Sequence, residues 1–324
     1  MSLFTLAELE AAADLVHRWV PPTPQYAWPL LAKRIGTEVW VKHENHTPTG
    51  AFKVRGGIVY VDALVRSGTK VRGLVTATRG NHGQSIARAA TAAGLRCVIY
   101  VPHGNSVEKN AAMRAFGAEL IEHGTDFDAA KAEASRAASE QGLHLVPSFH
   151  RDIVLGVATY ALELFRAVPT LDRVYVPIGL GSGIAGVIQV RDLLGLKTEV
   201  VGVVSDNADG YARSFEAGRV IATNSARTFA DGVAVREPDS AALKVIAAGA
   251  ARIVRVPDAT IAAAIRAYYV DTHNLAEGAG AAPLAALMQD GSEAHGKSVA
   301  VILCGGNIDS AVFRRVLDGE TPLP

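Results

Sequence analysis

The chain has 324 residues, of which 49% are hydrophobic and 20% are charged, a composition typical of an ordinary globular protein. Its 32 Lys and Arg residues equal its 32 Asp and Glu residues, so the formal net charge is zero. This balance removes the electrostatic reason to expect nucleic acid or an acidic membrane surface as a partner. At roughly 150 residues per domain, the length predicts about two domains.

Cysteine use and the N-terminal segment indicate a cytoplasmic protein. The two cysteines, Cys97 and Cys304, are too few for a disulfide framework, and no cluster of Cys and His has zinc spacing. The N-terminus lacks a basic stretch followed by an apolar run, which a signal peptide would need. No stretch approaches the roughly 18 consecutive apolar residues of a membrane span. We therefore expect a cytoplasmic enzyme or binding protein.

Along the first half, short β-branched runs alternate with Ala-rich helical runs. The half opens with an amphipathic helix, about Thr5–Trp19, followed by a Pro-rich joint. A loop rich in Gly, Thr and Pro then leads to Phe52–Gly57. The other segments are predicted as strands at 38–42, 73–78, 97–101, 119–122 and 143–147, and as helices at 82–93, 107–116 and 127–140.

The second half repeats this alternation. Its strands are expected at 173–177, 199–204, 252–256 and 299–304, with helices between them and at 310–317. Nearly continuous apolar strands that alternate with helices of about 10–15 residues are typical of parallel sheets covered on both faces. We predict an α/β fold with two open, mostly parallel twisted sheets, helices on both faces, and a cleft at the carboxyl ends of the strands.

Two glycine motifs match phosphate-binding patterns. Gly291–Ser298 matches G-x-x-x-x-G-K-[ST], but a helix precedes it and a strand follows, which reverses the order that phosphate binding needs. A polar turn is therefore the better interpretation. Gly181–Gly186 matches G-x-G-x-x-G between a strand and a helix, and Asp206 lies about 20 residues further on. A dinucleotide and a single phosphate monoester would both use such backbone amides, so this motif leaves both ligands open.

The segment His43–Gly57 carries the most chemical information. Lys53 lies between Phe52 and Val54, directly after the Gly- and Pro-rich loop, where its amine can be partly desolvated. Desolvation lowers the pKa of a lysine and leaves the amine able to form a Schiff base. The segment resembles the pyridoxal-phosphate attachment motif of the threonine/serine dehydratase family, K-x-E-x-x-x-x-T-G-S/A-F-K-x-R-G, whose members have fold type II.

Three further segments resemble the same family in the same order. Thr78–Gln84 is similar to its asparagine loop, Gly179–Gly183 to its glycine-rich phosphate loop, and Cys304–Asn307 to its S/C-G-G-N terminus. The resemblance extends over about 23–309 and is to the short, degradative members without a regulatory domain. It implies a fold similar to the tryptophan synthase β chain. The implied domains are a large pyridoxal-phosphate-binding domain (1–66 and 152–324) and a small substrate-closing domain (67–151).

The resemblance implies a role for each matching residue. Lys53 is implied to bind pyridoxal 5′-phosphate as an imine and, once substrate displaces it, to remove the α-proton. Asn81 is implied to hydrogen-bond the cofactor's 3′-oxygen, and Cys304 to face its pyridine nitrogen. The other implied cofactor contacts are Phe52, Glu277, Gly179, Leu180, Gly181, Ser182 and Gly183. The implied substrate-binding residues are Thr78, Arg79, Gly80, Asn81 and His82.

The reaction implied by the resemblance is a β-elimination. A 3-hydroxy amino acid such as L-threonine or L-serine would be dehydrated and deaminated to a 2-oxo acid and ammonia. A thiol cannot keep the pyridine nitrogen charged as a carboxylate would. Cys304 would therefore make the ring a milder electron sink and favour prompt loss of the β-substituent. A small buried residue that ends a strand is the alternative role for Cys304.

Arg79 departs from the family pattern, in which Ala or Ser is usual at this position. In racemising relatives a serine there supplies a proton, whereas an always-charged guanidinium is a poor proton donor. Racemase activity is therefore disfavoured. Arg79 could instead bind a second carboxylate through a forked hydrogen bond, which would shift specificity toward 3-hydroxyaspartate. A guanidinium turned outward to solvent is the alternative.

We expect no metal site. Some relatives bind a divalent cation through two carboxylates after the strand that follows the phosphate loop. Asp206 and Asp209 do not fall in that pattern, although they could form another site of hard oxygen ligands. His273 and Glu277 are expected at i and i+4 on one helix face, a spacing that could serve a metal. The resemblance instead implies that Glu277 lies near the cofactor and that His273 is structural.

The histidines on either side of Glu44 are also treated as non-metal residues. His43 and His46 are expected to point to opposite faces of an extended segment, where they could not share a ligand.

Other functions remain open at this point. A β-replacement enzyme or an amino-acid racemase could use the same scaffold, and product analysis separates these from the lyase. A nicotinamide oxidoreductase would need the glycine loop but not Lys53, and a non-catalytic pyridoxal-phosphate carrier would keep the whole motif set. The expected partners are a small amino-acid substrate and, by analogy with relatives, a second copy in a homodimer, with no nucleic acid and no membrane.

Overall fold

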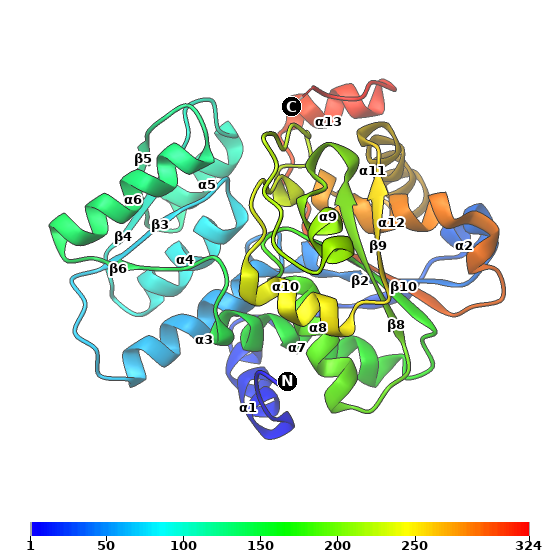
Figure 1. Ribbon diagram of the computed structural model, residues 1–324, viewed down its shortest axis with the longest axis horizontal. Helices are drawn as coiled ribbons and strands as arrows, with labels where there is room; N and C mark the ends of the chain where they lie inside the picture. The colour runs from blue at the N-terminus through cyan, green and yellow to red at the C-terminus, as the bar shows by residue number, and fades with distance from the viewer. Residues whose placement is uncertain (1, 324) are drawn as a thin grey trace.

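The chain forms two β-sheets with helices packed around them, as Figure 1 shows for the computed structural model, which describes residues 2–323. Within those residues the larger sheet has the strand order β1-β2-β10-β7-β8-β9 and the smaller sheet has the order β5-β4-β3-β6. The strands are β1 (Gln25–Ala27), β2 (Val39–His43), β3 (Leu74–Ala77), β4 (Cys97–Val101), β5 (Glu119–Glu122), β6 (His144–Leu145), β7 (Arg173–Pro177), β8 (Glu199–Ser205), β9 (Arg252–Val256) and β10 (Val299–Leu303).

The helices begin and end close to the predicted positions wherever one was predicted. None of the helices within the described range is long and apolar enough to cross a bilayer. They are α1 (Leu6–His17), α2 (Pro29–Ile35), α3 (Lys53–Arg66), α4 (Asn81–Ala92), α5 (Val107–Ala115), α6 (Phe127–Gln141), α7 (Arg151–Ala167), α8 (Ser182–Leu193), α9 (Gly210–Ala217), α10 (Ser240–Gly249), α11 (Asp258–Thr272), α12 (Gly278–Asp290) and α13 (Ser310–Leu317).

The larger sheet is parallel except at one edge, where β1 runs antiparallel to β2. Its strands β7 and β10 are buried along their whole length. Helix α12 packs against β7, β8, β9 and β10, while α8 packs against β7 and β8 and is covered in turn by α7 and α10. Burial on both faces explains why these strands read as continuous apolar runs rather than alternating ones.

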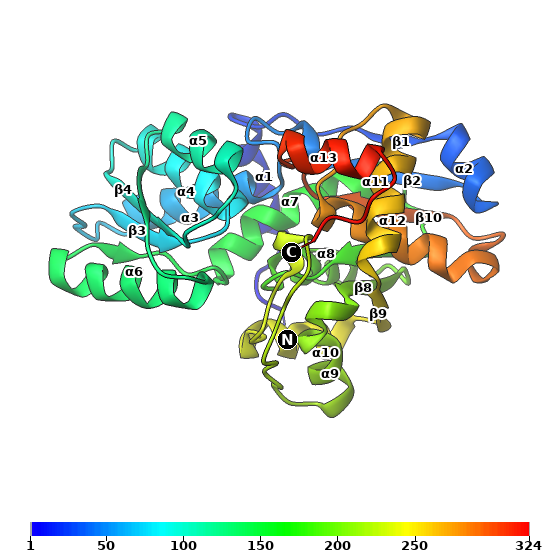
Figure 2. The same ribbon diagram turned by 90° about the horizontal axis from the view of Figure 1, so that it is seen from above.

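The smaller sheet is entirely parallel, and β3 and β4 are buried throughout. We call β3 to β6, together with α4, α5 and α6, the small-sheet unit, and the rest of the fold the large-sheet unit. Figures 1 and 2 both place the small-sheet unit to one side of the larger sheet. Helix α3 links the two, because it packs against α4 on one side and α7 on the other.

This architecture confirms the predicted α/β fold with two mostly parallel sheets. The small-sheet unit lies inside the range 67–151, but the predicted domain boundaries themselves stay a prediction. Four elements were not predicted, and all of them lie in the large-sheet unit or at its border: β1, α2, α3 and α7.

Helix α3 was missed because its sequence has weak helix propensity, with Gly56 and Gly57 in its first two turns and a β-branched run after them. Tertiary packing overrides this preference. A Cβ on Gly56 would lie 2.9 Å from the carbonyl oxygen of Ile153, and one on Gly57 would lie 2.2 Å from Oγ of Ser85. The glycines therefore let α3 approach α7 and α4 closely, which places Lys53 between the two sheets.

Two predictions about histidines were wrong. His43 and His46 were expected on opposite faces, but their rings stack with centroids 4.9 Å apart, because residues 44–46 form a 3₁₀ turn rather than an extended segment. His273 and Glu277 were expected on one helix face. Helix α11 ends at Thr272, His273 has a φ of +53° that breaks the helix, and Glu277 precedes the first residue of α12.

Candidate active site

The candidate site lies where the carboxyl ends of parallel strands from both sheets meet. Residues after β2 lead to Lys53, those after β3 form the asparagine loop, those after β7 form the glycine loop, and Cys304 directly follows β10. Ligands of open α/β sheets bind at such edges, because the loops from neighbouring strands converge there. The topology therefore brings together four motifs that are separated by up to 251 positions in the chain (304 − 53).

Lys53 is the first residue of α3, and the end of β10 holds it in place. The amide of Phe52 donates to the carbonyl of Cys304 at 2.9 Å, and Ala51 forms a β-bridge with Gly305. The ammonium donates to Oγ of Ser182 at 3.1 Å and lies 4.8 Å from the centroid of the Phe52 ring. Burial lowers the pKa of Lys53 to about 8, although the carboxylate of Glu277 opposes this change. About a tenth of the amine is therefore uncharged at pH 7, far more than for an ordinary lysine, and this fraction can attack a carbonyl carbon.

The glycine loop forms a cradle at the start of α8. Gly181 has a φ of +96°, which favours glycine, and a Cβ there would lie 2.6 Å from Cβ of Ala242. A Cβ on Gly179 would lie 2.4 Å from the carbonyl oxygen of Gly232. No side chain caps the first turn of α8, which leaves its amides available to an anion. Ser182 begins the helix, so the cradle adjoins the amine of Lys53.

The remaining member of the glycine loop, Leu180, contributes its carbonyl oxygen, which accepts a hydrogen bond from the Tyr211 hydroxyl at 3.2 Å. Gly183 faces the Phe52 ring, and its carbonyl accepts from the Tyr160 hydroxyl at 3.2 Å. Phe52 and the glycine loop therefore line the same space.

Asn81, the first residue of α4, is held by hydrogen bonds at both ends of its amide. Its Nδ2 donates to Oε1 of Glu277 at 2.7 Å, and its Oδ1 accepts from Nδ2 of Asn307 at 2.9 Å. Glu277 is 2% exposed, and burial raises the pKa of its carboxyl group, while Lys109 opposes that rise. The amide orientation is therefore set by the large-sheet unit, although Asn81 belongs to the small-sheet unit.

The asparagine loop leaves one imidazole nitrogen without a partner. Oγ1 of Thr78 accepts from the amides of Gly80 and Gly83 at 3.0 and 3.4 Å and so shapes the loop. Nε2 of His82 is buried and has no hydrogen-bond partner among the described residues. Burial, reinforced by the charge of Lys53, lowers the pKa of His82 to about 3, so its ring is neutral at physiological pH. A buried polar atom without a partner is typical of a site that awaits a ligand.

Two predicted site residues differ in their surroundings. Cys304 is 4% exposed, and burial raises the pKa of its thiol well above the usual value, so it stays protonated. Arg79 is exposed and makes no hydrogen bond or ion pair within residues 2–323. Of the predicted site residues, Arg79 is thus the one that the fold leaves free to move.

A buried cluster of charges behind Lys53 was not predicted. Arg55 donates to Glu44 at 2.7 and 3.0 Å and to Glu163 at 2.6 and 3.0 Å, and Lys42 donates to Glu163 at 2.6 Å. Burial opposes ionisation of Glu163, but Arg55 and Lys42 lower its pKa to about 2. The cluster has no net charge and joins β2, α3 and α7. The signal was present in the attachment motif, which contains Lys42, Glu44 and Arg55 at its K, E and R positions.

Two other candidates do not form part of the site. Asp209 accepts from Arg213 at 2.8 Å and from Arg255 at 3.0 Å, so its charge is already balanced. No group of three His, Cys, Asp or Glu side chains in the described part of the chain could hold a metal ion. The turn at Gly291–Ser298 lies between α12 and β10, in the order that disfavours phosphate binding.

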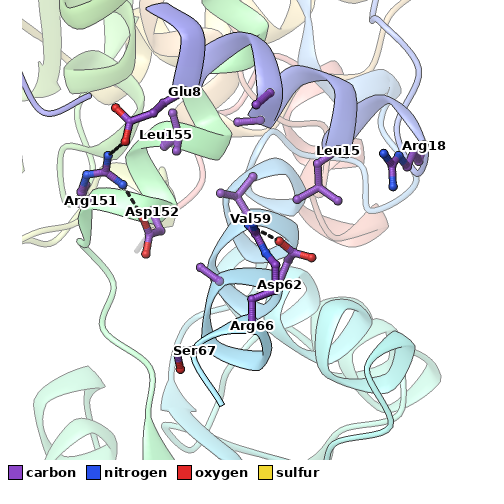
Figure 3. A pocket seen from close by; sticks show the side chains of 13 residues that line it. Glu8, Leu15, Arg18, Val59, Asp62, Arg66, Ser67, Arg151, Asp152 and Leu155 are labelled. Carbon is purple, nitrogen blue, oxygen red and sulfur yellow. Dashed lines mark hydrogen bonds and ion pairs between the residues drawn. The ribbon is translucent and has the colours of Figure 1, made fainter. Parts of the chain in front are cut away.

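A surface pocket of about 680 Å³ lies between α1, α3 and α7, at the end of α3 remote from Lys53 (Figure 3). Most of its charged groups pair with one another, Arg66 with Asp62 at 2.5 Å and Arg151 with Glu8 and Asp152, whereas Arg18 has no ion-pair partner among the described residues. The pocket therefore stands apart from the candidate site.

Comparison with known proteins identifies the family. Residues 16–305 match the family model described as pyridoxal-phosphate dependent enzyme. The chain belongs to this family. It is 34% identical to the L-threonine ammonia-lyase of Geobacter sulfurreducens, over 96% of this chain and 77% of that one, and 31% identical to that of Thermotoga maritima, over 98% and 79%. It spans 58% of a biosynthetic L-threonine dehydratase of Pasteurella multocida, to which it is 32% identical over 91% of this chain.

Solved structures agree with this assignment. The processed form of threonine deaminase isoform 2 from Solanum lycopersicum has a TM-score of 0.90 and 26% identity, covering 98% of this chain and 92% of that one. A pyridoxal 5′-phosphate-dependent aspartate racemase has the same TM-score and identity, covering 95% and 97%. This chain is therefore a threonine dehydratase-like enzyme, and pyridoxal 5′-phosphate is its cofactor.

The residues present fit that cofactor. Lys53 supplies a buried amine of lowered pKa for the aldehyde, and the uncapped first turn of α8 beside it suits the phosphate. The protonated Cys304 can pair with a neutral pyridine nitrogen. These features occur within one site, whereas nothing in it calls for a nicotinamide.

Proposed function

We propose that this enzyme dehydrates and deaminates a 3-hydroxy amino acid, with L-threonine and L-serine as the first candidates, to a 2-oxo acid and ammonia. The observation that carries the proposal is the partly buried Lys53 amine of lowered pKa, which faces Ser182 beside the glycine cradle. Similarity to L-threonine ammonia-lyases over nearly the whole chain supports the same reaction.

When bound, the cofactor supplies the electron sink that stabilises negative charge at the substrate's α-carbon. In the proposed mechanism, the Lys53 amine then takes the α-proton, because its lowered pKa makes it an effective base near neutral pH. The amides of Gly179–Gly183 hold the phosphate, and Asn81 binds the 3′-oxygen through its free N–H. Cys304 donates no charge to the ring, which favours elimination over a long-lived carbanion.

The substrate carboxylate is assigned to the asparagine loop. The amides of the first turn of α4 lack a side-chain cap, and Thr78 holds the loop in shape. The unpaired Nε2 of the neutral His82 lies at the same end of the helix and can serve the substrate as a hydrogen-bond partner.

The test is a panel of 3-hydroxy amino acids, with release of both ammonia and 2-oxo acid measured. We expect turnover of threonine or serine by the wild-type enzyme and none by Lys53→Ala, since the base and the cofactor's anchor are both lost. Equal release by the two proteins, or ammonia-free conversion of one enantiomer into the other, would contradict the proposal.

A 3-hydroxyaspartate dehydratase is the second candidate, and the free guanidinium of Arg79 favours it. A forked contact with the substrate's side-chain carboxylate is worth about 1.5–3 kcal/mol. Arg79→Ala should therefore lower kcat/KM for 3-hydroxyaspartate by at least about tenfold while leaving that for threonine nearly unchanged. Equal losses on both substrates would show that Arg79 does not select the side chain.

We also propose that the enzyme is a cytoplasmic homodimer. Exposed apolar side chains on neighbouring elements support a self-association surface. Helices α2 and α11 pack together, and the exposed side chains there are Tyr26 on β1, Leu30 on α2, Val270 near the end of α11, and Leu275 after it. Both cysteines are free thiols, as in a reducing compartment. Light scattering should give twice the mass of one chain, and Val270→Glu should shift it toward the monomer.

A further inference from the structure

A second buried lysine, Lys109, reaches the candidate site from the small-sheet unit. It lies on α5 and is 6% exposed, and its ammonium lies 2.6 Å from Oδ2 of Asp231 and 3.3 Å from Oε2 of Glu277. Both carboxylates belong to the large-sheet unit. The ion pairs therefore cross from one unit to the other at the cleft that holds the cofactor.

The stem of Lys109 lies directly against the asparagine loop. A Cβ on Gly80 would lie 2.4 Å from Cδ of Lys109, so any other residue at position 80 would displace the lysine. The lysine and the loop thus occupy one closely packed arrangement, with the ammonium beyond the loop and facing Glu277.

Glu277 connects Lys109 to the cofactor-binding amide. Its Oε2 faces Lys109 and its Oε1 accepts from Nδ2 of Asn81, whose Oδ1 accepts from Asn307. With Oδ1 and one N–H engaged, one N–H of Asn81 remains free to point into the site. This arrangement requires Oε1 of Glu277 to accept a hydrogen bond. An ionised carboxylate can do so at either oxygen, because it carries no proton.

The charged and titratable groups around Glu277 come from four elements: Lys109 on α5, Asp231 in the 3₁₀ turn 231–233, Lys53 on α3, and Cys304 after β10. Burial and the nearby Asp231 both disfavour the ionised form of Glu277, and the thiol of Cys304 is neutral. The amine of Lys53 is engaged by the cofactor in the holoenzyme. This leaves Lys109, which is shared between Asp231 at 2.6 Å and Glu277 at 3.3 Å, as the ammonium that offsets the charge of Glu277.

We propose that Lys109 is a positioning residue that orients Asn81 toward the cofactor by keeping Glu277 ionised while the two units are closed. Other contacts hold the same closed arrangement, namely Ser106 with Asp309, Glu108 with Ser310 at 2.7 Å, and Asp128 with Arg236. Lys109 is the one that lies within the site. The inference rests on the proposed role of Asn81, but not on the identity of the substrate.

Lys109→Met should therefore weaken cofactor binding and change the absorption spectrum of the bound cofactor as Asn81→Ala does. A loss of about tenfold in cofactor affinity is expected for one hydrogen bond to a charged group. In the double variant the two losses should not add, since both act on the same bond. Lys109→Arg should retain most of the wild-type affinity, because it keeps the charge.

A charge-matched double variant separates this role from simple packing. Lys109→Met combined with Glu277→Gln leaves no unbalanced buried carboxylate, and the glutamine oxygen can still accept from Asn81. We expect its spectrum and cofactor affinity to return toward wild type relative to Lys109→Met alone. Lys131→Met, at an exposed lysine on α6, is the matched control and should change neither quantity.

Three outcomes would overturn the inference: unchanged spectrum and affinity in Lys109→Met, full additivity with Asn81→Ala, or no recovery in the charge-matched double variant. If Lys109→Met does not fold, the Lys109→Arg and Glu277→Gln proteins still test it. In that case Glu277→Gln should change the spectrum less than Asn81→Ala does, because the glutamine oxygen can still accept from Asn81. None of these measurements uses substrate, so failure of the proposed reaction would not be mistaken for failure of this inference.

Discussion

At the residue scale, the environment of Lys53 decides its chemistry. The same side chain on an exposed helix would be a solvated cation, but here it is buried between Phe52, Ser182 and the end of β10. Burial shifts its pKa to about 8, while Cys304 is kept neutral by the same apolar surroundings. A single desolvated site thus produces both an amine that can act as nucleophile and base and a thiol that carries no charge.

The lowered pKa of Lys53 should make the free energy of unfolding of the apoprotein depend on pH. Because the folded apoprotein binds this proton less tightly than the unfolded chain, protonation of Lys53 destabilises the fold below pH 8. Stability should be regained as the pH rises from about 8 toward 10.5. Apoprotein carrying Lys53→Met should therefore be more stable than wild-type apoprotein at pH 7, with a smaller difference at pH 9.5. Urea unfolding at the two pH values measures this, and an equal difference at both would contradict it.

At the element scale, α3 owes its position to two glycines. Gly56 and Gly57 weaken the helix intrinsically, yet they allow close contact with the backbone of α7 and with Ser85 of α4. Since Lys53 begins this helix, the contact sets the position of the reactive amine. The glycine loop before α8 follows the same principle, with Gly181 in a left-handed conformation that turns the chain into the first turn of α8.

Gly56→Ala should lower the free energy of unfolding by roughly 1–3 kcal/mol, because the added methyl group would press against the carbonyl of Ile153 and force α3 away from α7. Gly183→Ala is the matched control for apoprotein stability. A Cβ there would lie 3.6 Å from the Phe52 ring, an ordinary contact, so no loss of stability is expected. Equal losses in the two variants would mean that the close packing of α3 is not the cause.

At the scale of the whole molecule, buried charges tie together segments far apart in the sequence. Lys42, Glu44 and Arg55 from the attachment motif pair with Glu163 of α7, and His17 of α1 contacts the same carboxylate at 2.8 Å. On the cleft side, Lys109 pairs with carboxylates of the opposite unit. One cluster supports the lysine from behind, and the other lies across the cleft.

Breaking the charge cluster around Arg55 should lower the free energy of unfolding. Arg55→Met would leave Glu44 buried without its cation and Glu163 with Lys42 as its remaining cation, and it should destabilise the protein by about 3–5 kcal/mol. Arg136→Met, which breaks exposed pairs with Glu133 and Glu140 on α6, should cost no more than about 1 kcal/mol.

The stability due to the lowered pKa of Glu163 is present above pH 4.5 and should be lost as the pH falls toward about 2. Chemical unfolding at pH 7 and pH 4 measures both effects.

Local periodicity determined most of the strands and the helices of the small-sheet unit, because those elements follow their intrinsic preferences. β4, β5, β7 and β9 have the predicted bounds. The short sequence motifs were also sufficient to identify the family and to predict its cofactor, since the four motifs keep their order along the chain. By contrast, α3 opposes its own propensity, and the bend after His273 depends on a backbone conformation that spacing alone cannot reveal.

Only the tertiary structure decided which groups face one another. The stacking of His43 on His46, the charge cluster around Arg55, and the contact of Lys109 with Glu277 all involve a local turn or partners distant in sequence. Pair energies and pKa values depend on separation and burial, which a residue pattern does not contain. The sequence alone thus determined the chemistry available to this protein, while the packing of its two sheets decided how those groups are charged and oriented.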